Sequence, residues 1–237
     1  MTQTVALRES KATARLAGLW YLLLGIGAGF SWMHITKVYV PDDALKTAAN
    51  INIAQTAYII SIIAASAGQL CFLFLALTLY RLFVKVDELQ ALIMAVLVCV
   101  SVPIMFIGIV FQTGAFVLLN RAHYTGLLSP EHVAASALMS LQMYFVTVKT
   151  VQIFWGLWLI PFATLALKSG FFPKVLCYLL FVSAGGYVLG SVSTLVSPSF
   201  HNLIEKYLSI PQALGEIIMI FFLLIAGVRP AKVRNEN

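Results

Sequence analysis

The chain has 237 residues, of which 61% are hydrophobic and only 10% are charged, and its mean hydropathy is +0.94. A soluble domain is about half apolar and about a quarter charged, so this composition excludes an ordinary soluble domain and indicates a multi-spanning membrane protein. The net charge of +6 does not indicate a nucleic-acid partner, because the basic residues are spread over short loops. In a membrane protein their distribution indicates which side of the membrane each loop lies on. The one partner that composition predicts is the lipid bilayer.

Six apolar segments are long enough to cross a bilayer, for which about 20 residues suffice. They are residues 14–35, 56–83, 89–119, 137–167, 172–196 and 210–228. The basic start followed by an apolar run is similar to a signal peptide, but the run is too long and lacks a small-x-small cleavage site, so we expect an uncleaved span. The sequence therefore predicts an all-α bundle of six transmembrane helices, forming a single domain over residues 1–237.

The basic residues of the loops are distributed unevenly between the two sides of the predicted membrane. One side carries ten, namely Arg8, Lys11, Arg15, Arg81, Lys85, Lys168, Lys174, Arg229, Lys232 and Arg234, and the other carries four, namely Lys37, Lys46, Arg121 and Lys206. Basic residues gather in short loops on the cytoplasmic side. We therefore expect a plasma-membrane protein with both termini in the cytoplasm.

The loops on the predicted outer side contain helix-start patterns. Asp42 and Asp43 are candidate N-caps of a short amphipathic segment through residue 53, and Ser129 followed by Pro130 is typical of a helix start leading into the fourth span. On the predicted inner side, Gly170 suits the position just after a helix end.

One constant offset relates the first and last predicted hairpins. A shift of 157 residues lays Pro41 on Pro198 and Gln55 on Gln212, along with several apolar matches. Parallel repeats of this kind occur in transporter folds. The alternative is that two apolar hairpins match through composition, so the repeat is a hypothesis.

Lys149 is a charge deep inside the fourth apolar segment, roughly 12 residues from its start. Gln142, Lys149, Gln152 and Gly156 share one helix face, because their spacing follows the helical period. A charge at the bilayer centre costs at least about 2.5–3.5 kcal/mol. We therefore expect this face to point at protein or water rather than at lipid.

Glu216 is the other charge well inside an apolar segment, at a depth that permits a salt bridge with Lys149 if their helices are neighbours. Such a pair is either part of a pocket for an ion, a proton or a polar ligand, or a buried pair that only fixes helix packing. Glutamine side chains fit either interpretation. In membrane spans they line polar cavities, or they form hydrogen bonds between helices that contribute about 0.6 kcal/mol each. The candidate ligand-binding residues are Gln112, Gln142, Lys149, Gln152, Gln212 and Glu216.

No metal, cofactor or disulfide is predicted. The four histidines, His34, His123, His132 and His201, fall on the predicted outer side without metal-ligand spacing, and Cys71, Cys99 and Cys177 lie in apolar runs. No P-loop, nucleophile-elbow or zinc-protease motif is present either.

Several short motifs resemble those of one membrane-protein family. They are Leu16-Ala-Gly-Leu-Trp-Tyr-Leu-Leu23, Leu79-Tyr80-Arg81-Leu82, Phe154-Trp-Gly-Leu-Trp158, Lys168-Ser-Gly-Phe-Phe-Pro-Lys174, Gly185-Gly186-Tyr187 and Gly215-Glu216. In this order they resemble the bacterial and archaeal family known as domain of unknown function 4386. The resemblance implies a six-span membrane protein and no particular activity.

Three classes of function follow from these residues. The leading hypothesis is binding or translocation of a small polar or amphipathic solute through an outward-facing intramembrane pocket. The alternative is a structural or accessory membrane protein with a packing salt bridge. An intramembrane enzyme is third, because Lys149 and Glu216 lack an accompanying nucleophile or metal motif.

Overall fold

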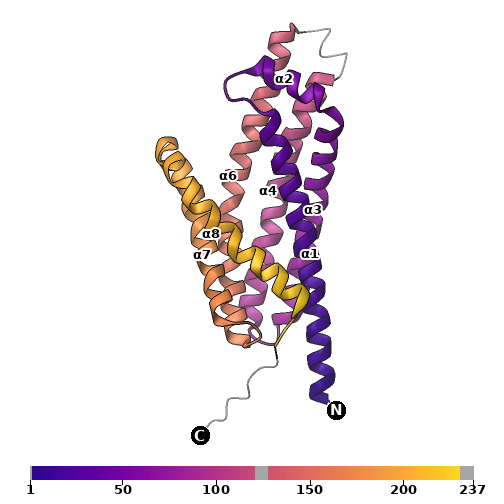
Figure 1. Ribbon diagram of the computed structural model, residues 1–237, viewed down its shortest axis with the longest axis vertical. Coiled ribbons are helices and arrows are strands. Elements are labelled where there is room, and N and C mark those ends of the chain that lie inside the picture. The colour runs from indigo at the N-terminus through magenta and orange to yellow at the C-terminus, as the bar shows by residue number, and fades with distance from the viewer. Residues whose placement is uncertain (1, 121–127, 230–237) are drawn as a thin grey trace. The chain divides into compact units, whose positions relative to one another are not determined.

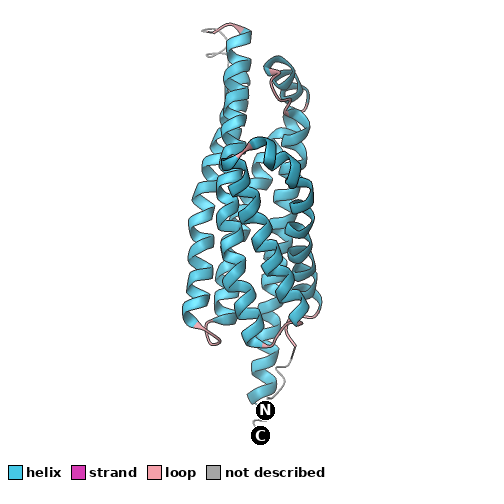
Figure 2. Cartoon of the chain, turned by 90° about the vertical axis from the view of Figure 1, so that its left-hand side faces the viewer, coloured by secondary structure: helices cyan, strands magenta, loops and turns pink. Residues whose placement is uncertain are grey.

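The structure is a computed structural model that describes residues 2–120 and 128–229. Within these ranges the chain forms helices joined by short loops and contains no strand (Figure 2). This confirms the predicted all-α class. Arg121, His123, Lys232 and Arg234 lie outside the described residues, as does any prediction made on them.

The described residues form seven helices (Figure 1). In chain order they are α1 (Thr2–Val38), α2 (Ala44–Ile53), α3 (Gln55–Phe83), α4 (Glu88–Asn120), α6 (Pro130–Ser169), α7 (Lys174–Val196) and α8 (Pro198–Ile225). Among the described residues, six of these helices, all but α2, are long and apolar enough to cross a membrane. The predicted number of spans is confirmed.

The last helix is longer than the sequence pattern predicted. The predicted span began near residue 210, whereas α8 begins at Pro198 and ends at Ile225. Its first turn is set by Ser197, whose side chain accepts a hydrogen bond from the Phe200 N–H, with proline in the first turn. Polar residues at the start of α8 lower hydropathy but do not break a helix, so the helix extends beyond the apolar span that hydropathy predicts.

The predicted helix ends are confirmed at three positions. Asp43 caps α2 by accepting a hydrogen bond of 2.9 Å from the Lys46 N–H. Ser129 precedes Pro130, the first residue of α6, and accepts from the His132 N–H. Gly170, just after α6, has a φ of 65°, a conformation that glycine adopts without strain.

The described chain divides into two compact units. Unit 1 comprises the described residues of Met1–Leu22, Cys71–Ser101 and Val151–Asn237, and unit 2 comprises those of Leu23–Leu70 and Val102–Thr150. Four helices, α1, α3, α4 and α6, therefore contribute one part to each unit. The single-domain organisation, the repeat of the hairpins and the orientation of the termini stay predictions.

Aromatic rings fill the core of unit 1. Trp158 stacks on Phe162 with ring centroids 5.4 Å apart, and Phe72 and Phe83 pack against these two rings at 5.3 and 6.0 Å. Large aromatic side chains bury the most apolar area per residue. These contacts join α3 to the C-terminal half of α6.

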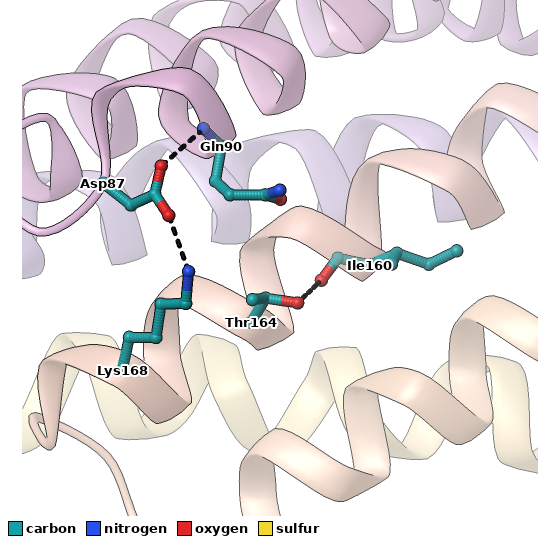
Figure 3. A network of polar contacts seen from close by, with 5 residues as sticks. All are labelled: Asp87, Gln90, Ile160, Thr164 and Lys168. Carbon is teal, nitrogen blue, oxygen red and sulfur yellow. Dashed lines mark hydrogen bonds and ion pairs between the residues drawn. The ribbon is translucent and has the colours of Figure 1, made fainter.

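One ion pair joins the α3–α4 turn to the end of α6 (Figure 3). Lys168 Nζ donates to Asp87 Oδ2 at 2.6 Å, and the Gln90 N–H donates to Asp87 Oδ1 at 3.1 Å. The hydrogen bond from Lys168 is the main reason that the pKa of Asp87 lies below its usual value. The contact therefore stabilises the fold above the ordinary pKa of an aspartate and is lost as the pH falls through the lowered pKa.

In unit 2, α2 folds back on the end of α1. Asn50 Nδ2 donates to the Val38 carbonyl at 3.2 Å, and Thr47 Oγ1 donates to the Val40 carbonyl at 3.1 Å. The bond from Asn50 satisfies a carbonyl group at the end of α1 that has no partner within the helix, and the bond from Thr47 holds the loop that follows α1. The short amphipathic segment is thus fixed to the helix that precedes it.

Candidate functional site

Glu216, on α8, forms a carboxylate–tyrosine cluster with Tyr21 of α1 and Tyr187 of α7, all in unit 1. The Tyr187 hydroxyl donates to Glu216 Oε1 at 2.7 Å, and the Tyr21 hydroxyl donates to Glu216 Oε2. Both carboxylate oxygens therefore have a donor, and the two donors come from different helices. An ionised carboxylate needs such donors when it leaves water.

Glycines bring α8 close enough to α7 for this contact (Figure 1). A Cβ atom on Gly215 would lie 2.8 Å from the Leu179 carbonyl oxygen and 2.5 Å from Ser183 Oγ, so no larger residue fits without a shift. One turn earlier, Gln212 Nε2 donates to the Gly186 carbonyl at 2.8 Å. The two helices are thus in close contact at Gly215 and Gln212, within one turn of Glu216.

Helix α6 adds a second polar group beside the cluster. The Trp155 ring lies edge-on to the Tyr187 ring at 6.3 Å, and its Nε1 is buried without a hydrogen-bond partner among the described residues. A Cβ on Gly156 would lie 2.8 Å from the Ala184 carbonyl oxygen, which shows how closely α6 and α7 pack there. Gln152, one turn before Gly156, is half-buried.

The cluster can hold one negative charge or one proton. An ionised carboxylate only accepts hydrogen bonds, so it matches two tyrosine donors, whereas a protonated carboxyl would have to donate to one of the hydroxyls. Among the described residues, no three His, Cys, Asp or Glu side chains are grouped so that they could hold a metal ion. The side chain of His201 lies outside the described part.

The remaining candidate residues belong to unit 2. Lys149 is half-buried near the midpoint of α6, Gln142 is half-buried two turns earlier, and Gln112 of α4 is fully buried. Lys149 and Glu216 thus fall in different units, so their pairing stays a prediction. Of the six residues, the structure places Gln152, Gln212 and Glu216 in unit 1 and Gln112, Gln142 and Lys149 in unit 2.

A family comparison covers the residues of the cluster. The model of the family described as "Domain of unknown function (DUF4386)" matches residues 16–227. The chain belongs to this family. No curated protein and no solved structure matches the chain. The DUF4386 match confirms the resemblance that the motifs carried, and its description names no activity.

Sequence reasoning missed Tyr21, Tyr187 and Trp155 as functional residues. Each stands in a segment with high hydropathy, where an aromatic side chain counts toward the apolar total and its polar atom is overlooked. Tyr21, Tyr187 and Glu216 each stand in one of the motifs that carried the family resemblance, and the matched range includes all three. The motifs therefore single out the three residues, but they do not indicate that the residues are in contact.

Proposed function

We propose that this DUF4386 protein is a plasma-membrane protein, with both termini in the cytoplasm, that binds or carries a small polar or amphipathic solute through a pocket open to the outside. The proposal rests mainly on the position of Lys149. It lies near the midpoint of a 40-residue helix of the apolar, membrane-spanning type and is only half-buried. Facing lipid would cost at least about 2.5–3.5 kcal/mol, which favours a water-accessible environment.

The other candidate residues supply the polar groups such a solute needs. In unit 2, Gln142 lies two turns before Lys149 and offers an amide that both donates and accepts, and in unit 1 Glu216 offers a carboxylate held by two hydroxyls while Gln152 and Gln212 offer further amides. Polar and ionisable side chains inside membrane spans commonly mark a substrate or ion pathway. When the solute binds, its polar group would replace the water molecules that otherwise form hydrogen bonds with these side chains.

A structural role is the second candidate, and one observation favours it. The carboxylate–tyrosine cluster joins α1, α7 and α8, and Gly215 fits tightly against α7 beside it. Interhelical hydrogen bonds and small residues are the usual means of helix association in membranes. In that case Glu216 would fix the packing of helices and bind nothing.

The Lys149→Cys variant tests the proposed pocket. In a background without the three native cysteines, we expect the new thiol to react in whole cells with an impermeant, positively charged methanethiosulfonate added outside. The rate should be below that of a loop cysteine, because the site lies about half a bilayer deep. Mass spectrometry of the purified protein measures the reaction.

Val148→Cys is the matched control, since Val148 is the neighbouring residue of α6 and is 4% exposed. We expect it to stay unreactive in the folded protein and to react after denaturation. If Lys149→Cys is as unreactive as Val148→Cys while an outer-loop cysteine reacts, the pocket does not exist and the structural role is the better explanation.

The orientation gives a separate prediction. Lys46 and Lys85 are both exposed, and the positive-inside distribution places them on opposite sides of the membrane. In the same cysteine-free background, Lys46→Cys should be labelled by the impermeant reagent in whole cells, and Lys85→Cys only after the membrane is permeabilised. The reverse pattern would place both termini outside.

A further inference from the structure

The C-terminal end of α8 lies against the N-terminal part of α1, and both belong to unit 1 (Figure 1). A Cβ atom on Gly18 would lie 2.8 Å from the Leu224 main-chain nitrogen. Two turns earlier on α1, the Lys11 carbonyl oxygen lies 3.2 Å from the position of a Cβ on Gly227. The two main chains are therefore in contact along two turns of α1.

Two arginines are held at this end of α8. Arg15 Nη2 donates to the Ile225 carbonyl at 3.1 Å, which satisfies one of the last carbonyl groups of the helix. Arg229 Cζ lies 5.4 Å from the centroid of the Phe222 ring, a cation–π contact. The Arg229 N–H donates to the Phe171 carbonyl at 3.0 Å, so its main chain is fixed as well. The contacts of both guanidinium groups therefore lie within one turn of α8.

Lys11, Arg15 and Arg229 form what we name the basic cluster of unit 1. Arg15 and Arg229 are exposed, and Lys11 is half-buried. In the part of the chain that the structure describes, no carboxylate forms an ion pair with any of the three, whereas Lys168 of the same unit pairs with Asp87. Like charges that lie close together repel one another, so a bound anion would stabilise this arrangement.

The basic cluster stands where two apolar spans end. The span on α1 begins at Ser10, and the span on α8 ends at Ile225. The ends of membrane spans lie at the level of the phospholipid headgroups. On α8, Phe221 and Ile225 are 52% and 72% exposed and lie one turn apart, so an apolar surface leads directly to the cluster.

We propose that the basic cluster of unit 1 is a binding site for the headgroup of an anionic phospholipid. The Arg15 and Arg229 guanidinium groups would donate to phosphate oxygens, which match their fork of N–H donors, and Lys11 would add a third positive charge. The acyl chains would lie along Phe221 and Ile225. A guanidinium has five N–H donors, so Arg15 can bind phosphate and keep its bond to Ile225.

Helix capping alone does not account for the basic cluster. A cation at a helix C-terminus is favourable, and the bond from Arg15 to the Ile225 carbonyl is of this kind. Capping gives no role to the guanidinium of Arg229, which lies over the Phe222 ring. The lipid site uses both arginines. It is separate from the proposed Lys149 pocket and uses none of the six candidate ligand-binding residues.

Native mass spectrometry of the full-length protein in detergent tests the proposal. The probes are phosphatidylglycerol, phosphatidylcholine with the same acyl chains, and inorganic phosphate. We expect phosphatidylglycerol to bind several-fold more tightly than phosphatidylcholine, because only the former carries a net negative charge. Inorganic phosphate should not displace the lipid, since it makes no contact with the exposed apolar side chains.

Two double variants make the test specific. Arg15→Gln with Arg229→Gln removes both guanidinium groups and should abolish the preference for phosphatidylglycerol. Arg81→Gln with Lys85→Gln is the matched control, because it removes two exposed positive charges from unit 1, at the end of α3 and in the turn after it. This control should keep the preference. Arg229→Gln alone replaces the first pair if that variant does not fold, because the bond to Phe171 uses only the main chain of Arg229.

Three results would overturn the proposal. The first is equal affinity of the wild-type protein for the two phospholipids. The second is equal loss of the preference in the two double variants, because binding would then follow net charge rather than the basic cluster. The third is displacement of the lipid by inorganic phosphate, which would show a site for the free ion. None of these results bears on the Lys149 pocket, which is tested by thiol labelling.

Discussion

Replacement of both Tyr21 and Tyr187 by phenylalanine should destabilise the folded protein by about 3–5 kcal/mol, because each hydrogen bond to a charged group contributes about 1.5–3 kcal/mol. The two hydroxyls are the donors to the two oxygens of Glu216. Without them the two carboxylate oxygens lose both of these hydrogen-bond donors. The measurement is the thermal unfolding midpoint in detergent, which should fall sharply.

A third substitution separates the loss of stability caused by the missing hydrogen bonds from the loss caused by changed packing. Adding Glu216→Leu to the double variant removes the charge that needs the donors, so much of the stability should return. Tyr178→Phe is the control, because Tyr178 lies on α7 but is 57% exposed, and it should have little effect. A triple variant no more stable than the double variant would contradict the contact between the hydroxyls and the carboxylate.

The extent of the helices was largely predictable because it depends on local properties of the chain. A run of about 20 apolar residues is sufficient for a span, and side-chain caps such as Asp43 and Ser129 act within one helical turn. Helix α8 extends beyond its predicted span for a related reason. Hydropathy averages over many residues, whereas the helix start at Pro198 is set by a single serine.

The carboxylate–tyrosine cluster was only half predictable. Glu216 stands out in the sequence, since a carboxylate in an apolar span is costly wherever it points. Its partner Tyr21 lies 195 residues away along the chain, and no periodic pattern connects positions at such a separation. The tertiary contact between α1 and α8 decides the pairing, and only the structure contains it.

The glutamines show a second limit of sequence reasoning. Gln112 is fully buried and hydrogen-bonded to Ser61, whereas Gln142 and Gln152 are half-buried on α6. The sequence places all three glutamines in apolar spans and gives no reason to prefer one of them as a binding residue. Which face of a span is buried depends on the neighbouring helices, and in a span that is apolar all round the pattern does not identify that face.

Gly27→Ala should have the second large effect on stability. A Cβ on Gly27 of α1 would lie 2.5 Å from the Ala64 carbonyl oxygen of α3, closer than real Cβ atoms approach backbone. The obstacle is main chain and cannot rotate away, so the two helices of unit 2 must separate. Overpacking of this kind typically costs about 1–3 kcal/mol, and we expect a value near the upper end from thermal unfolding in detergent.

Gly29→Ala is the matched control for this prediction, because it adds the same methyl group to the same helix two residues later. No atom lies within 4 Å of a Cβ at Gly29, so alanine meets no obstacle there and should stabilise α1 by about 0.5–1 kcal/mol through its better helix propensity. The two variants share the gain in propensity and differ in the contact with α3. The difference between their unfolding midpoints therefore measures that contact, and equal midpoints would show that α1 and α3 do not approach each other closely at Gly27.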